Sequence, residues 1–257
     1  MKNKLILLVI GLLCGSCAFA QHANFVTSGT IAFEKTTNMF AAEKQSFGDK
    51  PTVNNMQAYE RYKLNHPQFK KLNSTLVFNT DKTLYTPEDS PDNRIEWGEL
   101  VMGMQCNTVY MDLGKHTTAL QKNIFGSTFL LRDSIRKIKW KLTNETREIA
   151  GYTCRRANGV LLDSSVYVVA FYTDKIWVSG GPESFNGLPG MILGVVLPHL
   201  NVTWYATKVT AVTVPPATIQ PPKKGKVVNM TELRKVIRGG NAGMENGSPY
   251  RRLVFEL

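Results

Sequence analysis

Short segments in which apolar and polar residues alternate recur from residue 30 to residue 212. The clearest is Lys137–Leu142, where Ile138, Trp140 and Leu142 alternate with three lysines. A period of two is typical of a strand that has one buried face and one solvated face. Eight further segments also predict strands: 30–34, 72–85, 108–113, 125–131, 147–155, 166–173, 191–197 and 202–212. Of these, 166–173 is apolar on both faces, which predicts a central strand.

Helical periodicity is scarce by comparison. One helix is predicted at Asn54–Asn65, ending before Pro67, and a second short basic helix at Thr231–Arg238. The remaining connections are rich in turn residues, as in Pro87–Asn93. Short strands joined by turns form antiparallel sheets, so we expect a mainly β fold with one or two short helices.

The apolar pattern at the N-terminus is of a different kind. Lys2 and Lys4 precede an unbroken apolar run, and Ala18-Phe19-Ala20 follows it. This arrangement predicts a secretory signal peptide over residues 1–20, with cleavage near Ala20/Gln21. The run is too short to span a bilayer. A retained anchor helix, or lipid attachment at Cys14 or Cys17, are the alternatives.

Export changes how the cysteines are interpreted. Cys14 and Cys17 form a C-x-x-C pattern, but they lie in the segment that cleavage removes. The two that remain, Cys106 and Cys154, predict a disulfide, because paired cysteines in an oxidising compartment are mostly structural. No cysteine and histidine cluster has metal-ligand spacing, so neither a metal nor a cofactor is predicted.

Composition separates residues 214–257 from the antiparallel β domain predicted over 21–213. Pro215-Pro216 and Pro221-Pro222 predict an extended, stiff segment. After Thr207 the chain carries nine Lys or Arg against three Glu, within a net charge of +11. In an exported protein, this basic tail favours attraction to an anionic envelope surface over nucleic-acid binding. The alternative is a solvated tail without a partner.

The most distinctive stretch is Phe185–Ile192. Gly187 and Gly190 permit positive φ or a close backbone approach, and Pro189 fixes its own φ. Two interpretations are open: a structural corner, or a loop that docks a ligand or partner. The candidate binding residues of this corner are Phe185, Gly187, Leu188, Pro189, Gly190, Met191 and Ile192.

The hexapeptide and the strands before it resemble the GLPGLI family, exported proteins of Bacteroidetes named for that motif. The hexapeptide here is Gly187–Ile192, with Met at its fifth position. Three further blocks match the family in order and spacing, within residues 125–209: Trp140–Thr143 with Ile149–Ala157, Ala170–Ile176 and Gly181–Phe185.

The resemblance implies a periplasmic or envelope-associated protein of largely unknown function, with genes often near those of TonB-dependent outer-membrane receptors. It also implies a single curved antiparallel sheet or half-barrel, similar to that of lipoprotein carriers. The comparison with the carriers is an analogy of fold and carries little weight for function.

Three functional hypotheses follow, and none has a catalytic motif behind it. G-x-S-x-G, H-E-x-x-H and a phosphate-binding glycine loop are missing from the sequence, so catalytic residues are not assigned. The first hypothesis is a non-catalytic accessory protein that binds an envelope protein, such as an outer-membrane receptor, or an apolar or peptide-like ligand. The second is a lipid carrier with a cavity lined by Trp140, Phe171 and Trp204. The third is an enzyme of unrecognised class, in which Glu183 is a candidate general base.

Overall fold

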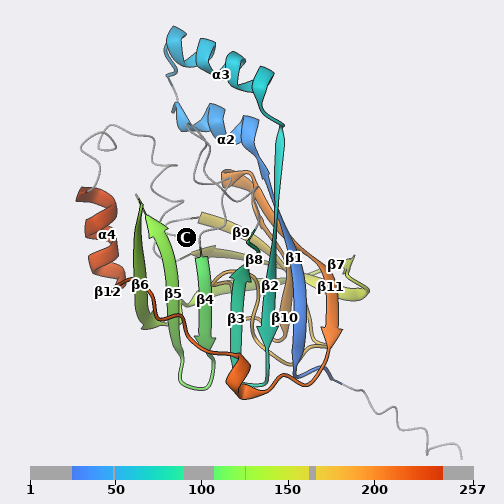
Figure 1. Ribbon diagram of the computed structural model, residues 1–257. Helices are drawn as coiled ribbons and strands as arrows, with labels where there is room; N and C mark the ends of the chain where they lie inside the picture. The colour runs from blue at the N-terminus through green and yellow to red at the C-terminus, as the bar shows by residue number, and fades with distance from the viewer. Residues whose placement is uncertain (1–24, 49, 90–106, 125, 162–165, 240–257) are drawn as a thin grey trace, which may run out of the picture.

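A single curved, unclosed sheet of twelve strands forms the body of the molecule (Figure 1). The computed structural model describes residues 25–48, 50–89, 107–124, 126–161 and 166–239. Three α-helices occur within these ranges. The predicted mainly β fold with one curved antiparallel sheet is therefore confirmed.

Strand order in space is β12-β6-β5-β4-β3-β2-β1-β11-β10-β9-β8-β7. Every neighbouring pair is antiparallel except β12 and β6, which are parallel. The strands are β1 Gly29–Asn38, β2 Phe69–Phe78, β3 Lys82–Pro87, β4 Asn107–Asp112, β5 Thr117–Ile124, β6 Ser127–Ser134, β7 Ile138–Ile149, β8 Tyr152–Leu161, β9 Val166–Thr173, β10 Met191–Leu197, β11 Val202–Ala211 and β12 Lys226–Val228.

We call the sheet face that contacts residues 177–190 the inner face. Strict alternation directs Ile31, Phe33, Lys35 and Thr37 of β1 to this face. Most of the buried apolar side chains of the sheet and of residues 177–190 belong to one cluster. Burying a single side chain such as Phe33 stabilises the fold by about 1.5–3 kcal/mol. The core therefore lies between the curved sheet and the segment that crosses it.

Residues after Val214 pack against both faces of the sheet. On the outer face, Val214 and the fully buried Ile219, beside the 3₁₀-helix η5 (Pro216–Thr218), cover Tyr110 and Ala119. β12 then extends the sheet beyond β6, and α4 (Met230–Gly239) buries Leu233 and Ile237. The segment predicted as a separate tail thus joins the body at least as far as residue 239.

Helices α2 (Met39–Ser46) and α3 (Val53–Asn65) stand beyond the ends of β1 and β2, at one end of the sheet (Figure 1). The side chain of Asn38 accepts a hydrogen bond from Ala41 N and caps α2. A second 3₁₀-helix, η4, spans Pro198–Leu200. Within the described ranges, no helix has the length and apolar character needed to cross a membrane.

Candidate functional site: a cavity on the inner face

The predicted corner is part of the segment that covers the inner face. Gly187 and Gly190 have φ of 90° and 136°, values that favour glycine. The ring of Phe185 lies 6.0 Å from that of Trp204, between ring centroids. Leu188 is 2% exposed, and of the seven corner residues only Gly187 and Pro189 are exposed. The corner therefore directs most of its side chains into the core.

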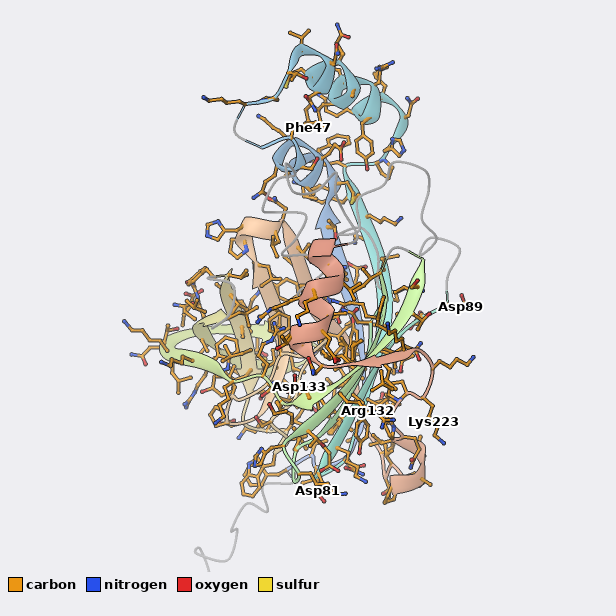
Figure 2. All side chains as sticks on the ribbon, turned by 90° about the vertical axis from the view of Figure 1, so that its left-hand side faces the viewer. Phe47, Asp81, Asp89, Arg132, Asp133 and Lys223 are labelled. Carbon is orange, nitrogen blue, oxygen red and sulfur yellow. The ribbon has the colours of Figure 1, made fainter. Side chains whose placement is uncertain are left out.

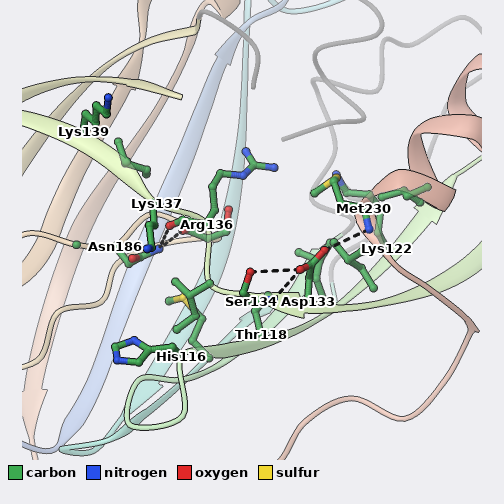
Figure 3. Close-up of a pocket in the computed structure, with 18 residues that line it drawn as sticks. His116, Thr118, Lys122, Asp133, Ser134, Arg136, Lys137, Lys139, Asn186 and Met230 are labelled. Atoms are coloured by element: carbon green, nitrogen blue, oxygen red, sulfur yellow. Dashed lines mark hydrogen bonds between the residues drawn. The ribbon is translucent and has the colours of Figure 1, made fainter. Parts of the chain in front are cut away.

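A cavity of about 970 Å³ lies beside this segment (Figure 3). The inner face of β4–β6 forms one wall, and the chain from Ser134 to Lys139 forms another. Residues from 184–187 and from the start of α4 complete its lining. Its lining residues are Met111, His116, Thr118, Leu120, Lys122, Leu131, Asp133, Ser134, Ile135, Arg136, Lys137, Ile138, Lys139, Ser184, Asn186, Gly187, Met230 and Leu233.

The cavity combines apolar and charged surface. Leu120 and Leu131 contribute apolar surface from the sheet, and Leu233 contributes it from α4. Asp133, at the end of β6, accepts hydrogen bonds from Ser134 N at 2.7 Å and from Met230 N at 3.3 Å. Figure 2 shows α4 rising from this point, above Asp133. The aspartate therefore joins the sheet to the start of the helix.

Trp140 and Asn186 fix the opposite wall. Trp140 Nε1 donates a hydrogen bond to Asn186 O at 2.9 Å. The amide of Asn186 donates to Ser184 O at 2.8 Å and to Arg136 O at 3.4 Å. The indole of Trp140 also packs against Gly159, where a Cβ would be 2.7 Å from Trp140 Cε3. Four chain segments are thus tied together at one side of the cavity.

Behind this wall lies a buried charged cluster around Glu183. Glu183 has a left-handed backbone, with φ of 52°, and its Oε2 accepts a hydrogen bond from Asn107 Nδ2 at 2.9 Å. Burial raises the pKa of Glu183, and the positive charges of Lys35 and Lys122 and the Asn107 bond oppose that rise. Lys122 also lines the cavity, so it connects the cluster to the open space.

Four buried polar atoms on the inner face complete no hydrogen bond within the described part of the chain. They are Ser74 Oγ, Thr83 Oγ1, Asn107 Oδ1 and Trp204 Nε1. Burial and the charge of Glu183 raise the pKa of Tyr85, which lies among them. The side chains of Ser74 and Trp204 act in the opposite direction on that pKa. Groups of this kind bind ordered water or a polar ligand.

The three predicted ligand-face aromatics do not share one face. Trp140 and Trp204 lie on the inner face, where they contact Asn186 and Phe185. Phe171 points to the outer face, with its ring 6.5 Å from that of Tyr205 and 5.8 Å from the Arg147 guanidinium. None of the three lines the cavity.

Only one of the two cysteines of the predicted disulfide, Cys154, lies within the described residues. Cys154 is fully buried, its thiol donates to Tyr152 O at 3.4 Å, and burial raises its pKa to about 12. Cys106 lies outside the described residues, as does the predicted signal peptide, so both features stay predictions. No group of three metal-ligating side chains (His, Cys, Asp or Glu) occurs in the described ranges.

The sequence pattern indicated Glu183 as a candidate general base but gave no role to the residues around it. Lys35 and Lys122 occupy inward-facing positions of β1 and β5, at 6% and 3% exposure. A lysine in the apolar phase of a strand is a detectable signal, because such positions seldom bury a charge without a partner. Asn107 follows a stretch without clear periodicity and gives no comparable signal.

Comparison with known proteins identifies a different family from the one predicted. The family model described as "N-glycanase peptide, N-terminal domain", of the PNGase F-II type, matches residues 73–233, which is more than half of the chain. No curated protein matches. Two solved structures of PNGF-II are similar. The one in space group C2 has a TM-score of 0.51 and 15% identity, over 80% of this chain and 32% of that chain. The one in space group P21 has a TM-score of 0.48 and 16% identity, over 79% of this chain and 32% of that chain.

At this identity the structural likeness shows the fold alone, and this chain covers 32% of the PNGF-II chain. The predicted membership of the GLPGLI family is wrong, because the matching model is that of the N-glycanase domain. Two predicted functions are therefore also wrong: that of a GLPGLI-type accessory protein linked to TonB-dependent receptors, and that of a lipid carrier. The reason is physical: Gly187 and Gly190 are required by the φ angles of the corner, and a pattern set by turn geometry is not specific to one family.

Proposed function

The chain belongs to the family of N-glycanase N-terminal domains, and we propose that it binds N-glycosylated polypeptides through the inner-face cavity. In this proposal it presents the glycan-bearing segment to a catalytic unit that removes the glycan. The observation that carries the proposal is positional. All eighteen cavity-lining residues fall within the matched residues 73–233.

Size and lining support binding of a saccharide. A cavity of about 970 Å³ lies at the upper end of the usual range for ligand sites, roughly 300–1,000 Å³. The apolar surface of Leu120 and Leu131 lies beside the hydroxyls of Thr118 and Ser184. Such a mixture matches a sugar ring, which has apolar C–H faces and polar edges.

The carboxyl groups favour binding over catalysis by this chain alone. Glycosidic cleavage commonly uses two carboxyl groups about 5–10 Å apart. Among the described lining residues only Asp133 carries one, and it already accepts hydrogen bonds from two backbone amides. Glu183 is buried behind the wall, at 6% exposure. We therefore assign the bond cleavage to a separate catalytic unit. We also propose export through the predicted signal peptide, because secreted proteins are where N-glycans occur.

Paired ligands test this function. The chain from Gln21 onward is titrated calorimetrically with an N-glycopeptide and with the same peptide carrying an unmodified Asn. We expect the glycopeptide to bind at least about tenfold more tightly, a difference of about 1.4 kcal/mol. Equal affinity for the two peptides would refute glycan recognition. Release of glycan by the chain alone would refute the division between binding and catalysis.

A matched pair of variants tests the location. Ser184 lines the cavity, and Thr213 is exposed outside it. Ser184→Trp should fill part of the cavity and abolish measurable glycopeptide binding, whereas Thr213→Trp should leave the affinity unchanged. Circular dichroism establishes that both variants are folded. If the folded Ser184→Trp variant binds as the unmodified chain does, the ligand lies elsewhere.

A further inference from the structure

We propose that the cavity selects saccharides that carry a negatively charged group, a carboxylate, sulfate or phosphate, and that Lys122 and Arg136 bind that group. The inference rests on the proposed function and narrows its substrate class to acidic N-glycans. The observation that carries it is the placement of cationic residues around one cavity.

Positive charge dominates the described lining of the cavity. Lys122, Arg136, Lys137 and Lys139 line it, against the single carboxylate of Asp133. That carboxylate is held by Ser134 N and Met230 N, so part of its charge is already offset. The resulting potential favours an anionic ligand.

Lys122 provides charge at the floor of the cavity. It lies in β5 opposite Asn107 and Phe129, and only 3% of it is exposed. Glu183 lies close enough on the core side for the lysine charge to oppose the rise in its pKa, while the same lysine borders the open cavity. A charge that is largely shielded from water acts more strongly on a ligand than one on the open surface.

Arg136 provides the second cation, from the opposite wall. Its backbone oxygen accepts a hydrogen bond from the Asn186 amide at 3.4 Å, which fixes the chain at this point. In Figure 3 its side chain extends toward the side of the cavity formed by Lys122 and Met230. A guanidinium presents paired donors that match the two oxygens of a carboxylate or the oxygens of a sulfate or phosphate. An anion between the two walls would meet both cations.

The ligand test compares glycopeptides that differ in one charge. Three glycopeptides are each titrated into the protein. The first ends in N-acetylneuraminic acid, the second is the same glycopeptide after removal of that sugar, and the third is the second with one sulfate added. We expect each anionic form to bind about tenfold more tightly than the neutral form. The advantage should shrink as ionic strength rises from about 50 to 300 mM. The carboxylate and sulfate arms show which anion is preferred.

The outcomes separate this inference from the proposed function. If the neutral and acidic glycopeptides bind equally, the charge selection is refuted and glycan binding stands. If neither binds better than the bare peptide, both fail. If a bare peptide with added Asp residues binds as tightly as the acidic glycopeptide, the anion site recognises acidic peptide, and the inference about glycans is overturned.

Two lysines on one strand provide the matched control. Lys139 lines the cavity, while Lys141, two residues further along the same face of β7, is exposed and does not. Arg136→Gln should weaken binding of the acidic glycopeptide about tenfold and that of the neutral one less than twofold. Lys139→Gln should have a smaller effect of the same sign, and Lys141→Gln none. Equal losses for Lys139→Gln and Lys141→Gln, or equal losses for both ligands with Arg136→Gln, would overturn the proposal.

Discussion

Replacing Gly190 by alanine should destabilise the protein far more than the same change at Gly187, although both belong to one turn. A Cβ at Gly190 would collide with the carbonyl oxygen of Thr173, lie 2.8 Å from its carbonyl carbon and 3.1 Å from Asp174 Cα. All three are backbone atoms at the end of β9, so no side-chain rotation relieves the contact. At Gly187 the nearest atom would be Trp140 Nε1, at 3.5 Å.

The magnitude has two parts. A φ of 136° at Gly190 costs an alanine about 1–3 kcal/mol, and relieving the backbone collision costs about 1–3 kcal/mol more. The sum, about 2–6 kcal/mol, is a large fraction of a total stability of roughly 5–15 kcal/mol. Gly187, with φ of 90°, has only the conformational part. Alanine recovers about 0.4–1 kcal/mol of that part by restricting the unfolded chain.

Urea denaturation of the unmodified protein, Gly190→Ala and Gly187→Ala measures the loss of stability caused by each substitution. We expect Gly190→Ala to lose about 1–3 kcal/mol more than Gly187→Ala, which is the collision part. In thermal unfolding this difference corresponds to roughly 2–4 °C per kcal/mol for a chain of this size. Equal losses would mean that the corner does not press against β9 as described. A loss below about 0.5 kcal/mol for Gly190→Ala would show that the turn relaxes freely.

Two further predictions concern the wall and the cluster behind it. Trp140→Phe removes the bond to Asn186 O and should lower the free energy of unfolding by about 1–3 kcal/mol; an unchanged urea midpoint would contradict a structural role for that bond. Because burial raises the pKa of Glu183, its contribution to stability is complete below its ordinary pKa and is lost as the pH rises to the raised value. The stability of the unmodified protein relative to Glu183→Gln should therefore fall with rising pH across that window, by at most about 1.4 kcal/mol per pH unit; a flat or rising difference would mean that the lysines outweigh burial.

Local chemistry predicted much of the fold correctly. The alternation of Lys137–Leu142 lies almost entirely within β7, and the helix predicted at Asn54–Asn65 is α3, Val53–Asn65. The two glycines of the corner indeed have positive φ. These features depend on interactions between residues close in sequence, so a pattern contains enough information to place them.

The candidate site depends on contacts between distant residues, which patterns do not contain. Glu183 and Asn107 are 76 positions apart, and Lys35 reaches the ring of Trp204 only because β1 pairs with β11. The cavity requires the start of α4 to lie next to Asp133 of β6. A basic segment after a Pro-rich stretch resembles a solvated tail until its apolar residues find a surface to cover. Here Ile219, Leu233 and Ile237 do so.

The corner joins the stability of the core to the shape of the cavity. Within five residues, Phe185 packs on Trp204 and Leu188 enters the core, while Ser184, Asn186 and Gly187 line the cavity. Substitutions of the buried members should therefore alter stability and binding together. Substitutions of rim cations such as Lys139 should alter binding alone, because their side chains are exposed. If the cavity arose only from imperfect packing, no substitution would alter binding while leaving stability unchanged. Such substitutions therefore distinguish a binding site from a void.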